Sequence, residues 1–198
     1  MPLDIEDHGS GNVVEVSPDV RGALVGRVVF VGDGALVSIG AGTVDTGMRV
    51  EAGSGSVVRL GARNHLGGLF VHAAAGAVVE LGDDIGINGL VRLLAHEAAR
   101  IVVGSGGLIA ADVEISASDM HPVFDVATGL RINPAADVVI GARVWLGQRC
   151  MVLNGVEIGA DCVVGAGSVV TKRVPPGCVV AGNPARVVRR GVRWAMDC

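Results

Sequence analysis

The chain has 198 residues, with 16 Lys and Arg against 20 Asp and Glu, and the resulting net charge of −4 argues against nucleic acid as a partner. Half of the residues are hydrophobic, yet no apolar run reaches the roughly 18 residues of a membrane span, and the start lacks the basic and apolar segments of a secretory signal. The 31 glycines and the scarcity of aromatic residues indicate a chain that turns often around a narrow aliphatic interior.

The N-terminal part of the chain divides into a polar start and a loose repeat. Residues 1–27 are polar and lack the repeat, so we expect an N-terminal cap or arm there. The phrases VSIG at 37–40, VRLG at 58–61 and VELG at 79–82 then recur 21 residues apart. We interpret them as successive coils of one solenoid that carries about three additional residues at one corner.

A stricter repeat of six residues occupies the C-terminal half. Its branched aliphatic positions are Ile140, Leu146, Val152, Ile158, Val164 and Val170. Such a unit cannot bury its apolar side alone, so copies must stack and share one core. Three hexads make an 18-residue coil with one inward aliphatic residue on each side. The sequence therefore predicts an all-β fold, a parallel β-helix over residues 28–183.

The repeat is interrupted once. Between Ile115 and Ile140 the register breaks, so we expect residues 117–137 to leave the coil as a protruding loop, and such loops often carry function. His121 is the one histidine in this loop, and its side chain is suited to general-base chemistry near neutral pH. Asp119 either holds the imidazole in one tautomer or caps the loop turn.

The C-terminal end should close the coil. Asn183-Pro184 halts the repeat, and residues 184–198 are predicted to form a short helix with one apolar stripe, which consists of Ala185, Val188, Val192 and Ala195. A cap of this kind covers the open end of a solenoid.

The cysteines and histidines argue against disulfides and metals. The four cysteines form no CxxC pair, so we expect free thiols in a reducing cytoplasm. The histidines at 65, 72, 96 and 121 are not spaced to converge as three ligands, so no metal is expected.

The stretch from Asp137 to Arg189 contains VVGAGSVVTK followed by AGNPA, and it resembles the hexapeptide-repeat acyltransferases that fold as a left-handed parallel β-helix. The loop phrase SASDMHPVFD resembles, within that family, the enzymes that O-acetylate bacterial surface polysaccharides and sugars. The resemblance implies a left-handed coil, a homotrimer with active sites between neighbouring prisms, and acetyl-CoA as the acyl donor.

The resemblance also implies roles for residues on the loop and the coil after it. His121 would be the general base, with Asp119 beside it. Trp145 is too large for the prism interior and should point outward. It would pack the pantetheine arm of the donor, orient the reacting groups through its N–H, or pack against another subunit.

Donor binding is expected at a corner of small residues and at nearby cations. Gly147, Gly165 and Ala166 would let the CoA arm approach, with backbone N–H groups free for its amides. Thr171, Lys172 and Arg186 would lie near the phosphates, since cations and guanidinium groups suit phosphate. Arg173 stands where the family usually has an acidic residue.

The predicted function is transfer of an acetyl group from acetyl-CoA to a hydroxyl of a sugar or surface polysaccharide. Two alternatives stay open: N-acetylation of an amino sugar nucleotide or an antibiotic, and a non-enzymatic β-helix scaffold. The sequence does not identify the acceptor.

Overall fold

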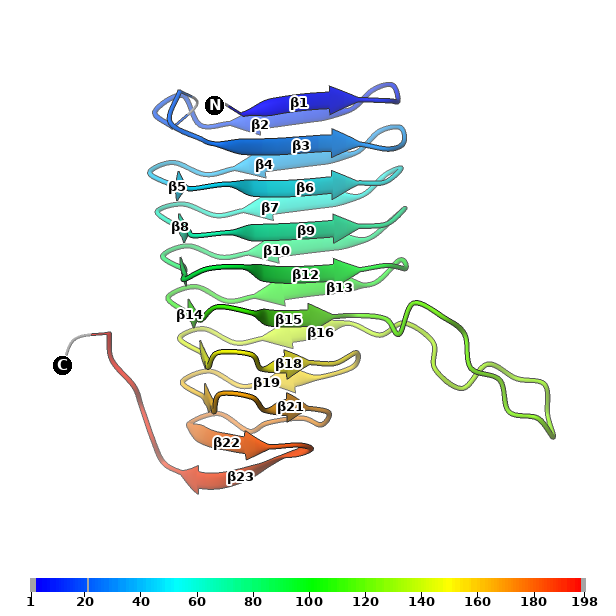
Figure 1. Ribbon diagram of the computed structural model, residues 1–198, viewed down its shortest axis with the longest axis vertical. Helices are drawn as coiled ribbons and strands as arrows, with labels where there is room; N and C mark the ends of the chain where they lie inside the picture. The colour runs from blue at the N-terminus through cyan, green and yellow to red at the C-terminus, as the bar shows by residue number, and fades with distance from the viewer. Residues whose placement is uncertain (1–2, 21, 197–198) are drawn as a thin grey trace.

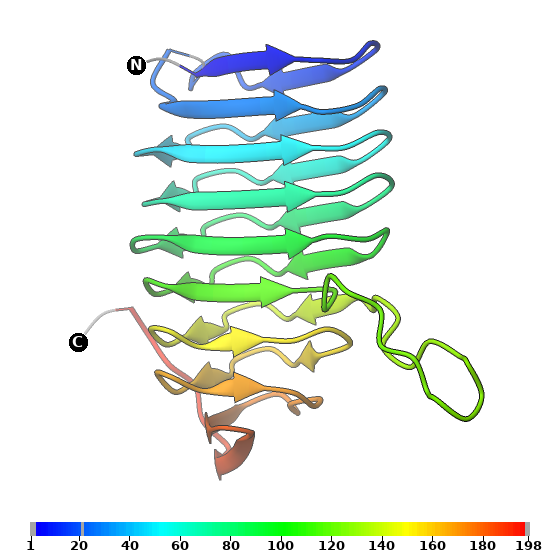
Figure 2. The same cartoon turned by 45° about the vertical axis from the view of Figure 1, so that its right-hand side comes forward.

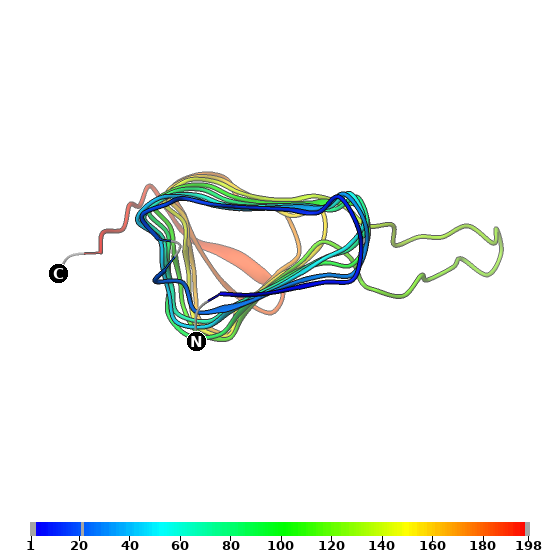
Figure 3. The ribbon, with the colours of Figure 1, turned by 90° about the horizontal axis from the view of Figure 1, so that it is seen from above.

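The computed structural model describes residues 3–20 and 22–196, which form one parallel β-helix with three sheets as its faces (Figures 1 and 3). The predicted all-β solenoid with a protruding loop is confirmed. Within the described residues no segment is helical, and none therefore has the length and apolarity of a membrane-spanning helix.

Each sheet runs along the axis of the prism, with one strand from each coil hydrogen-bonded to the next. The first sheet contains, in spatial order, β1 (Asp4–Asp7), β3 (Gly26–Phe30), β6 (Met48–Ala52), β9 (Leu69–Ala73), β12 (Val91–Ala95), β15 (Val113–Ser116), β18 (Met151–Val152) and β21 (Val169–Val170). The second sheet contains β2 (Val13–Val16), β4 (Leu36–Ile39), β7 (Val57–Leu60), β10 (Val78–Leu81), β13 (Arg100–Val103), β16 (Val138–Ile140) and β19 (Glu157–Ile158). The third sheet contains β5 (Val44–Asp45), β8 (His65–Leu66), β11 (Gly86–Ile87), β14 (Leu108–Ile109), β17 (Trp145–Leu146), β20 (Val163–Val164), β22 (Cys178–Gly182) and β23 (Ala185–Arg190).

The hexad aliphatics form the core. All six predicted inward positions of the C-terminal half are at most 2% exposed, and these are Ile140, Leu146, Val152, Ile158, Val164 and Val170. Successive coils place them directly above one another, because Leu146 pairs with Val164 and Val152 with Val170. Each inward side chain therefore rests on the equivalent one of the next coil, which buries a continuous aliphatic column.

The longer N-terminal coils differ from the prediction in where they place their additional residues. The turn between β9 and β10 has the same four-residue length as the turn between β18 and β19. β9 and β10 have five and four residues, whereas β18 and β19 have two each. The additional residues lengthen two faces and do not bulge at a corner, so the prism is wider at its N-terminal end (Figure 3).

Both ends of the chain depart from expectation. Residues 1–27 were predicted to be a cap or arm, but β1 pairs in parallel with β3, and β2 pairs with β4. These strands form the first coil, and Val14 and Val16 pack against the core. The sequence VVEV at 13–16 forms a strand whose side chains alternate between exposed and partly buried positions, although it lacks the hexapeptide spacing.

The predicted C-terminal helix over 184–198 is wrong for the described residues. Ala185–Arg190 form β23, which pairs antiparallel with β22. β22 is the last parallel strand of the third sheet, and without β23 its outer edge would expose unpaired backbone groups. β23 forms hydrogen bonds with the backbone groups of that edge. A helix at the same place would leave those groups unpaired. Val188 of the expected apolar stripe is 63% exposed.

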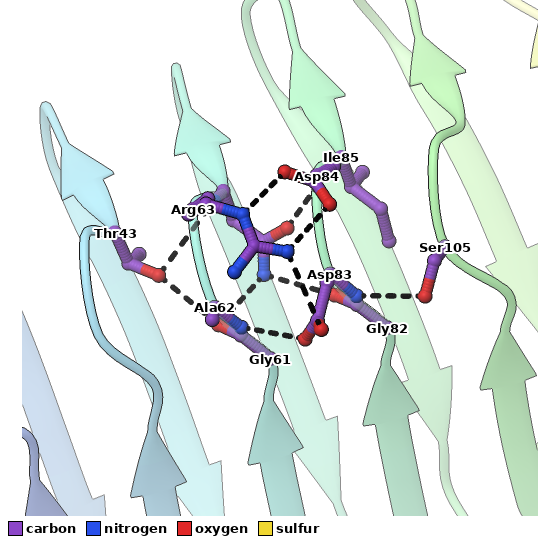
Figure 4. Close-up of polar contacts among 10 residues, drawn as sticks. Thr43, Gly61, Ala62, Arg63, Gly82, Asp83, Asp84, Ile85 and Ser105 are labelled. Carbon is purple, nitrogen blue, oxygen red and sulfur yellow. Dashed lines mark hydrogen bonds and ion pairs between the residues drawn. The ribbon is translucent and has the colours of Figure 1, made fainter.

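The corner between the second and third sheets carries a stack of polar contacts (Figure 4). Asn64 is fully buried there, and its amide Nδ2 donates to the carbonyls of Gly61 (3.0 Å) and Gly82 (3.1 Å). Its Oδ1 accepts from the N–H of Ile85 at 2.8 Å. Because these partners belong to two successive coils, one side chain ties the corner of each coil to the next.

Exposed ion pairs follow the same corner. Arg63 and Asp84 both have positive φ (55° and 56°), and the guanidinium of Arg63 bonds the Asp84 carboxylate at 2.7 Å through two nitrogens. Arg143 and Asp161 repeat this arrangement further along the axis, at 2.7 and 2.6 Å. Each carboxylate lies beside a guanidinium that holds the pKa of the carboxyl below its usual range.

One carboxyl interrupts the aliphatic interior. Asp45 occupies an inward position of the third sheet in register with Leu66, and it is 4% exposed. Its Oδ1 accepts from the N–H of Gly47 at 2.8 Å, while Oδ2 has no partner among the described residues. Burial raises the pKa of the Asp45 carboxyl, because removal from water disfavours the charged form.

We expect Asp45→Asn to stabilise the protein at neutral pH. A raised folded-state pKa means that the stability from Asp45 is fully present below its unfolded pKa and is lost as the pH rises through the folded value. Asparagine keeps an oxygen acceptor for Gly47 and carries no charge. The Tm should rise by a few degrees at pH 7, on a scale of about 2–4 °C per kcal/mol, and the gain should vanish below about pH 4.

Thermal unfolding at pH 7 and pH 3.5 measures this effect. Glu15→Gln removes a charge of the same sign from an exposed position with no ion-pair partner among the described residues, and it is the control, expected to change the Tm by less than a degree or so. A variant at Asp45 that melts lower than the parent at pH 7 would contradict this expectation.

Candidate functional site

The protruding loop is an irregular hairpin between β15 and β16 (Figures 1 and 2). Its two arms are joined where the N–H of Ile132 donates to the carbonyl of Val123 and the N–H of Asp125 donates to the carbonyl of Leu130, both at 2.9 Å. An isolated antiparallel bridge between Phe124 and Arg131 lies between these contacts. The loop therefore has its own backbone structure and can hold side chains in fixed positions away from the prism.

His121 lies on this loop and is exposed. Its backbone is fixed from both sides, because its N–H donates to the carbonyl of Asp119 at 2.7 Å and its carbonyl accepts from Nδ2 of Asn133 at 2.9 Å. The same Asn133 amide donates to the Asp119 carboxylate at 3.0 Å. Of the two roles left open for Asp119, this geometry favours support of the loop turn.

The root of the loop is fastened to the prism by Glu97, which follows β12. The guanidinium of Arg131 forms two hydrogen bonds with the Glu97 carboxylate, at 2.6 and 2.7 Å. The hydroxyl of Ser118 donates to the same carboxylate. Arg131 first and then Ser118 lower the pKa of the Glu97 carboxyl to about 2. This clasp was not predicted from the sequence, because Glu97 and Arg131 are 34 residues apart and no periodic signal links them.

Two histidines occupy the outer face of the first sheet near this root. The rings of His72 and His96 have centroids 4.6 Å apart, and Nδ1 of His72 lies 3.1 Å from a carboxylate oxygen of Glu51. Burial, and next the neighbouring His72, lower the pKa of His96. A lowered pKa favours the neutral imidazole, which is the form that can accept a proton, so His96 stays a second candidate base.

Trp145 lies on β17 of the third sheet, and its side chain points outward with 40% exposure, as expected. Its neighbour β14 lies on the side of the prism opposite to the protruding loop (Figures 1 and 3). A single chain therefore keeps His121 and Trp145 apart. The indole of Trp145 instead faces that of Trp194, with ring centroids 6.1 Å apart.

The small-residue corner follows directly after Trp145. Gly147 is buried, and a Cβ there would lie 2.6 Å from the carbonyl oxygen of Val164, so the close stacking of coils requires glycine. Gly165 takes the equivalent position one coil later. The exposed Ala166 follows it and provides a flat surface.

The expectation of several free backbone donors at this corner is wrong. The N–H of Gly165 donates to Val180 and that of Gly167 donates to Gln148, both at 2.8 Å. Of the three N–H groups at residues 165–167, only that of Ala166 lacks a backbone acceptor among the described residues. Coil stacking uses the other donors, which leaves one for a ligand.

The predicted cations converge at the C-terminal end of the prism. Lys172 and Arg186 line one cavity of about 200 Å³, together with Arg173. β23 brings Arg186 to this place, although it is a strand and not the expected helix. Arg173 pairs with Glu157 at 3.2 Å, so its charge is already balanced. Thr171 is exposed on the adjoining turn.

The cysteines are structural. Cys150, Cys162 and Cys178 are buried free thiols, and burial raises the pKa of Cys150 to about 12. Cys198 was predicted to be a free thiol and lies outside the described residues. Across residues 3–20 and 22–196, no three His, Cys, Asp or Glu side chains are grouped so as to hold a metal ion.

Comparisons with known proteins agree with the β-helix fold. The family model described as "Bacterial transferase hexapeptide (six repeats)" matches residues 137–172. The structure is similar to that of the polySia-specific acetyltransferase NeuO, with a TM-score of 0.86 and 30% identity over 99% of this chain and 90% of that one. The polysialic acid O-acetyltransferase OatWY gives a TM-score of 0.88 and 27% identity over 98% of this chain and 92% of that one.

Among curated sequences, a polysialic acid O-acetyltransferase of Escherichia coli O1:K1 / APEC is 36% identical over 99 residues, which is 50% of this chain and 32% of that protein. The chain thus spans about a third of this curated relative.

We expect the Glu97 clasp to protect the loop from proteolysis. Glu97→Gln keeps the shape of the side chain but removes the charge that Arg131 binds, and charge-assisted pairs are about twice as strong as neutral ones. Arg131 is itself a trypsin site, so its rate of tryptic cleavage should rise roughly tenfold as the loop opens more often.

Mass spectrometry of the fragments measures the rate at this bond. Glu80→Gln, which removes a carboxylate paired with Arg59 and Arg100 on the second sheet, is the control and should leave it unchanged. Equal cleavage of the parent and Glu97→Gln would show that the clasp does not hold the loop.

Proposed function

This chain belongs to the hexapeptide-repeat acyltransferases, and on that premise we propose that it transfers an acetyl group from acetyl-CoA to a hydroxyl of a sugar or surface polysaccharide. The observation that carries the donor half is the cavity where Lys172 and Arg186 meet, close to the end of the hexapeptide coils. Two cations without carboxylate partners among the described residues suit the phosphates of CoA. The buried free thiols fit a reducing compartment, and we propose a cytoplasmic location.

The acceptor half of the site would come from a second subunit. His121 and Trp145 lie on opposite sides of one prism, so a working site needs the loop of one copy beside the third sheet of another. The loop exposes six large apolar side chains, which are Met120, Val123, Phe124, Val126, Leu130 and Ile132. Monomers rarely expose such a group, and contact with a neighbouring copy would cover it. We therefore retain the homotrimer as the proposed assembly.

The proposed reaction is direct acyl transfer. The imidazole of His121 takes the proton of the acceptor hydroxyl as the oxygen attacks the thioester carbonyl. A tetrahedral intermediate forms, the C–S bond breaks, and the imidazolium returns its proton to the departing CoA thiolate. Trp145 of the neighbouring copy packs the arm that carries the thioester. Asp119 acts on His121 through the loop backbone and Asn133.

We expect release of the CoA thiol from acetyl-CoA to depend on His121. Without its base, His121→Ala should lower kcat by roughly 10²–10⁴ and leave the Kd for CoA unchanged. His121→Asn should be nearly as poor, because an amide cannot take the proton. Asp119→Asn should cost about tenfold, since it acts only on the position of His121.

A thiol-release assay with a panel of sugars, amino sugars and water measures these rates and separates O-transfer from N-transfer. His8→Ala, at an exposed position on the first coil, is the control. If His121→Ala retains more than about half of the turnover, the base lies elsewhere and His96 is the next candidate.

Mixing two variants, each lacking one proposed half of the site, tests whether the site is shared between copies. A trimer that combines His121→Ala with Trp145→Ala subunits contains some interfaces where an intact loop meets an intact Trp145. Random mixing should restore about a quarter of the parent sites, because half of the copies supply each side. Joint unfolding and refolding of the two variants, followed by the same assay, measures the recovery. No recovery above the sum of the separate variants would show that His121 of one copy and Trp145 of another do not form one shared site.

A further inference from the structure

We propose that Trp194 is a positioning residue of the donor site: it fixes the indole of Trp145 and forms with it an aromatic wall for the apolar arm of CoA. This inference rests on the proposed function, since it assigns a further part of the same donor site. The sequence pattern assigned residue 194 no role beyond a position in the expected helix.

The C-terminal tail brings Trp194 to this place. After β23 the chain runs back along the outside of the prism (Figures 1 and 2). The N–H of Val192 donates to the carbonyl of Gly177 at 3.1 Å, which guides the tail toward the third sheet. A helix over 184–198 would have carried this indole elsewhere, so the hairpin of β22 and β23 decides its position.

Two contacts hold the Trp194 ring. Its Nε1–H donates to the carbonyl of Arg143 at 2.7 Å, a short and directional bond. Arg143 is itself fixed, because its guanidinium bonds the Asp161 carboxylate at 2.7 and 2.6 Å. The ring lies 6.1 Å from that of Trp145 with a 47° angle between the planes, within the range of favourable tilted aromatic pairs.

The pair is not explained by the core. Neither tryptophan belongs to the buried aliphatic cluster, and Trp145 remains 40% exposed. The chain has only two Trp, and their indoles lie together at one point on the surface. That point adjoins Gly147 and Ala166, the corner with one free backbone donor. Aromatic faces beside a flat, small-residue surface are suited to an apolar chain with amide groups, which is the chemistry of pantetheine.

The competing explanation is that Trp194 only fastens the tail. A fastening role predicts that loss of the ring frees the tail and leaves donor binding unchanged. A positioning role predicts that loss of the ring changes the environment of Trp145 and weakens the donor. Because the chain has only these two tryptophans, ultraviolet spectroscopy reports on the pair alone.

The experiment compares the full-length parent with Trp194→Ala and Trp194→Phe. Met196→Ala, which truncates another exposed apolar side chain of the same tail, is the matched control. Near-ultraviolet circular dichroism records the indole pair, tryptophan emission follows titration with CoA, and steady-state kinetics gives kcat and KM for acetyl-CoA. A similar Tm in all four proteins shows that the fold is retained.

We expect the parent to show a circular dichroism signal of paired indoles that disappears in both Trp194 variants. Trp194→Ala should raise the Kd for CoA and the KM for acetyl-CoA by about tenfold, with kcat changed by less than about twofold. Trp194→Phe should lie between, because it keeps an aromatic face and loses the N–H that bonds Arg143. Met196→Ala should match the parent.

Failure of the positioning role and failure of the proposed function give different results. If the parent binds CoA and Trp194→Ala binds it equally well, the positioning role is overturned while the proposed function stands. If the parent binds no CoA by calorimetry, the proposed function fails and the donor role of Trp194 fails with it.

Discussion

The structure depends on the stacking of each coil directly on the next. Parallel strands place equivalent residues above one another, so an inward aliphatic side chain such as Leu146 rests on Val164 of the following coil. The corners must approach as closely as the strands do. A Cβ at Gly104 would lie 2.6 Å from the backbone nitrogen of Ala142, which excludes larger residues there. Core and corners together fix the register, so additional residues either lengthen the strands of successive coils, as in β9 and β10, or leave the coil between strands, as the protruding loop does.

That constraint separates the parts of the candidate site. The protruding loop leaves between the first and second sheets, whereas Trp145 projects from the third sheet. No rearrangement inside a stacked prism can bring these faces together. The exposed apolar side chains of the loop and the separation of His121 from Trp145 within one chain therefore favour the same conclusion. Assembly with a second copy belongs to the proposed mechanism.

Polar contacts fix the elements that coil stacking does not position, namely the corners, the protruding loop and the C-terminal tail. Asn64 links successive corners from inside, while Glu97 and Arg131 fasten the loop from outside. The Trp194 bond to Arg143 fastens the tail in the same way. Each contact joins segments that are distant in sequence, and each fixes an element whose position the aliphatic column does not determine.

The sequence by itself determined the repeating core, the break that releases the loop, and the residues of the small-residue corner. These features have a fixed period, and the period is local information that directly reflects which side chains face inward. Only the tertiary structure decided features that depend on pairing across coils. The stripe of Ala185, Val188, Val192 and Ala195 fits a helix, but the open edge of β22 required a strand. Glu97 meets Arg131, and Trp145 meets Trp194, because folding superimposes distant coils, and no spacing along the chain records that contact.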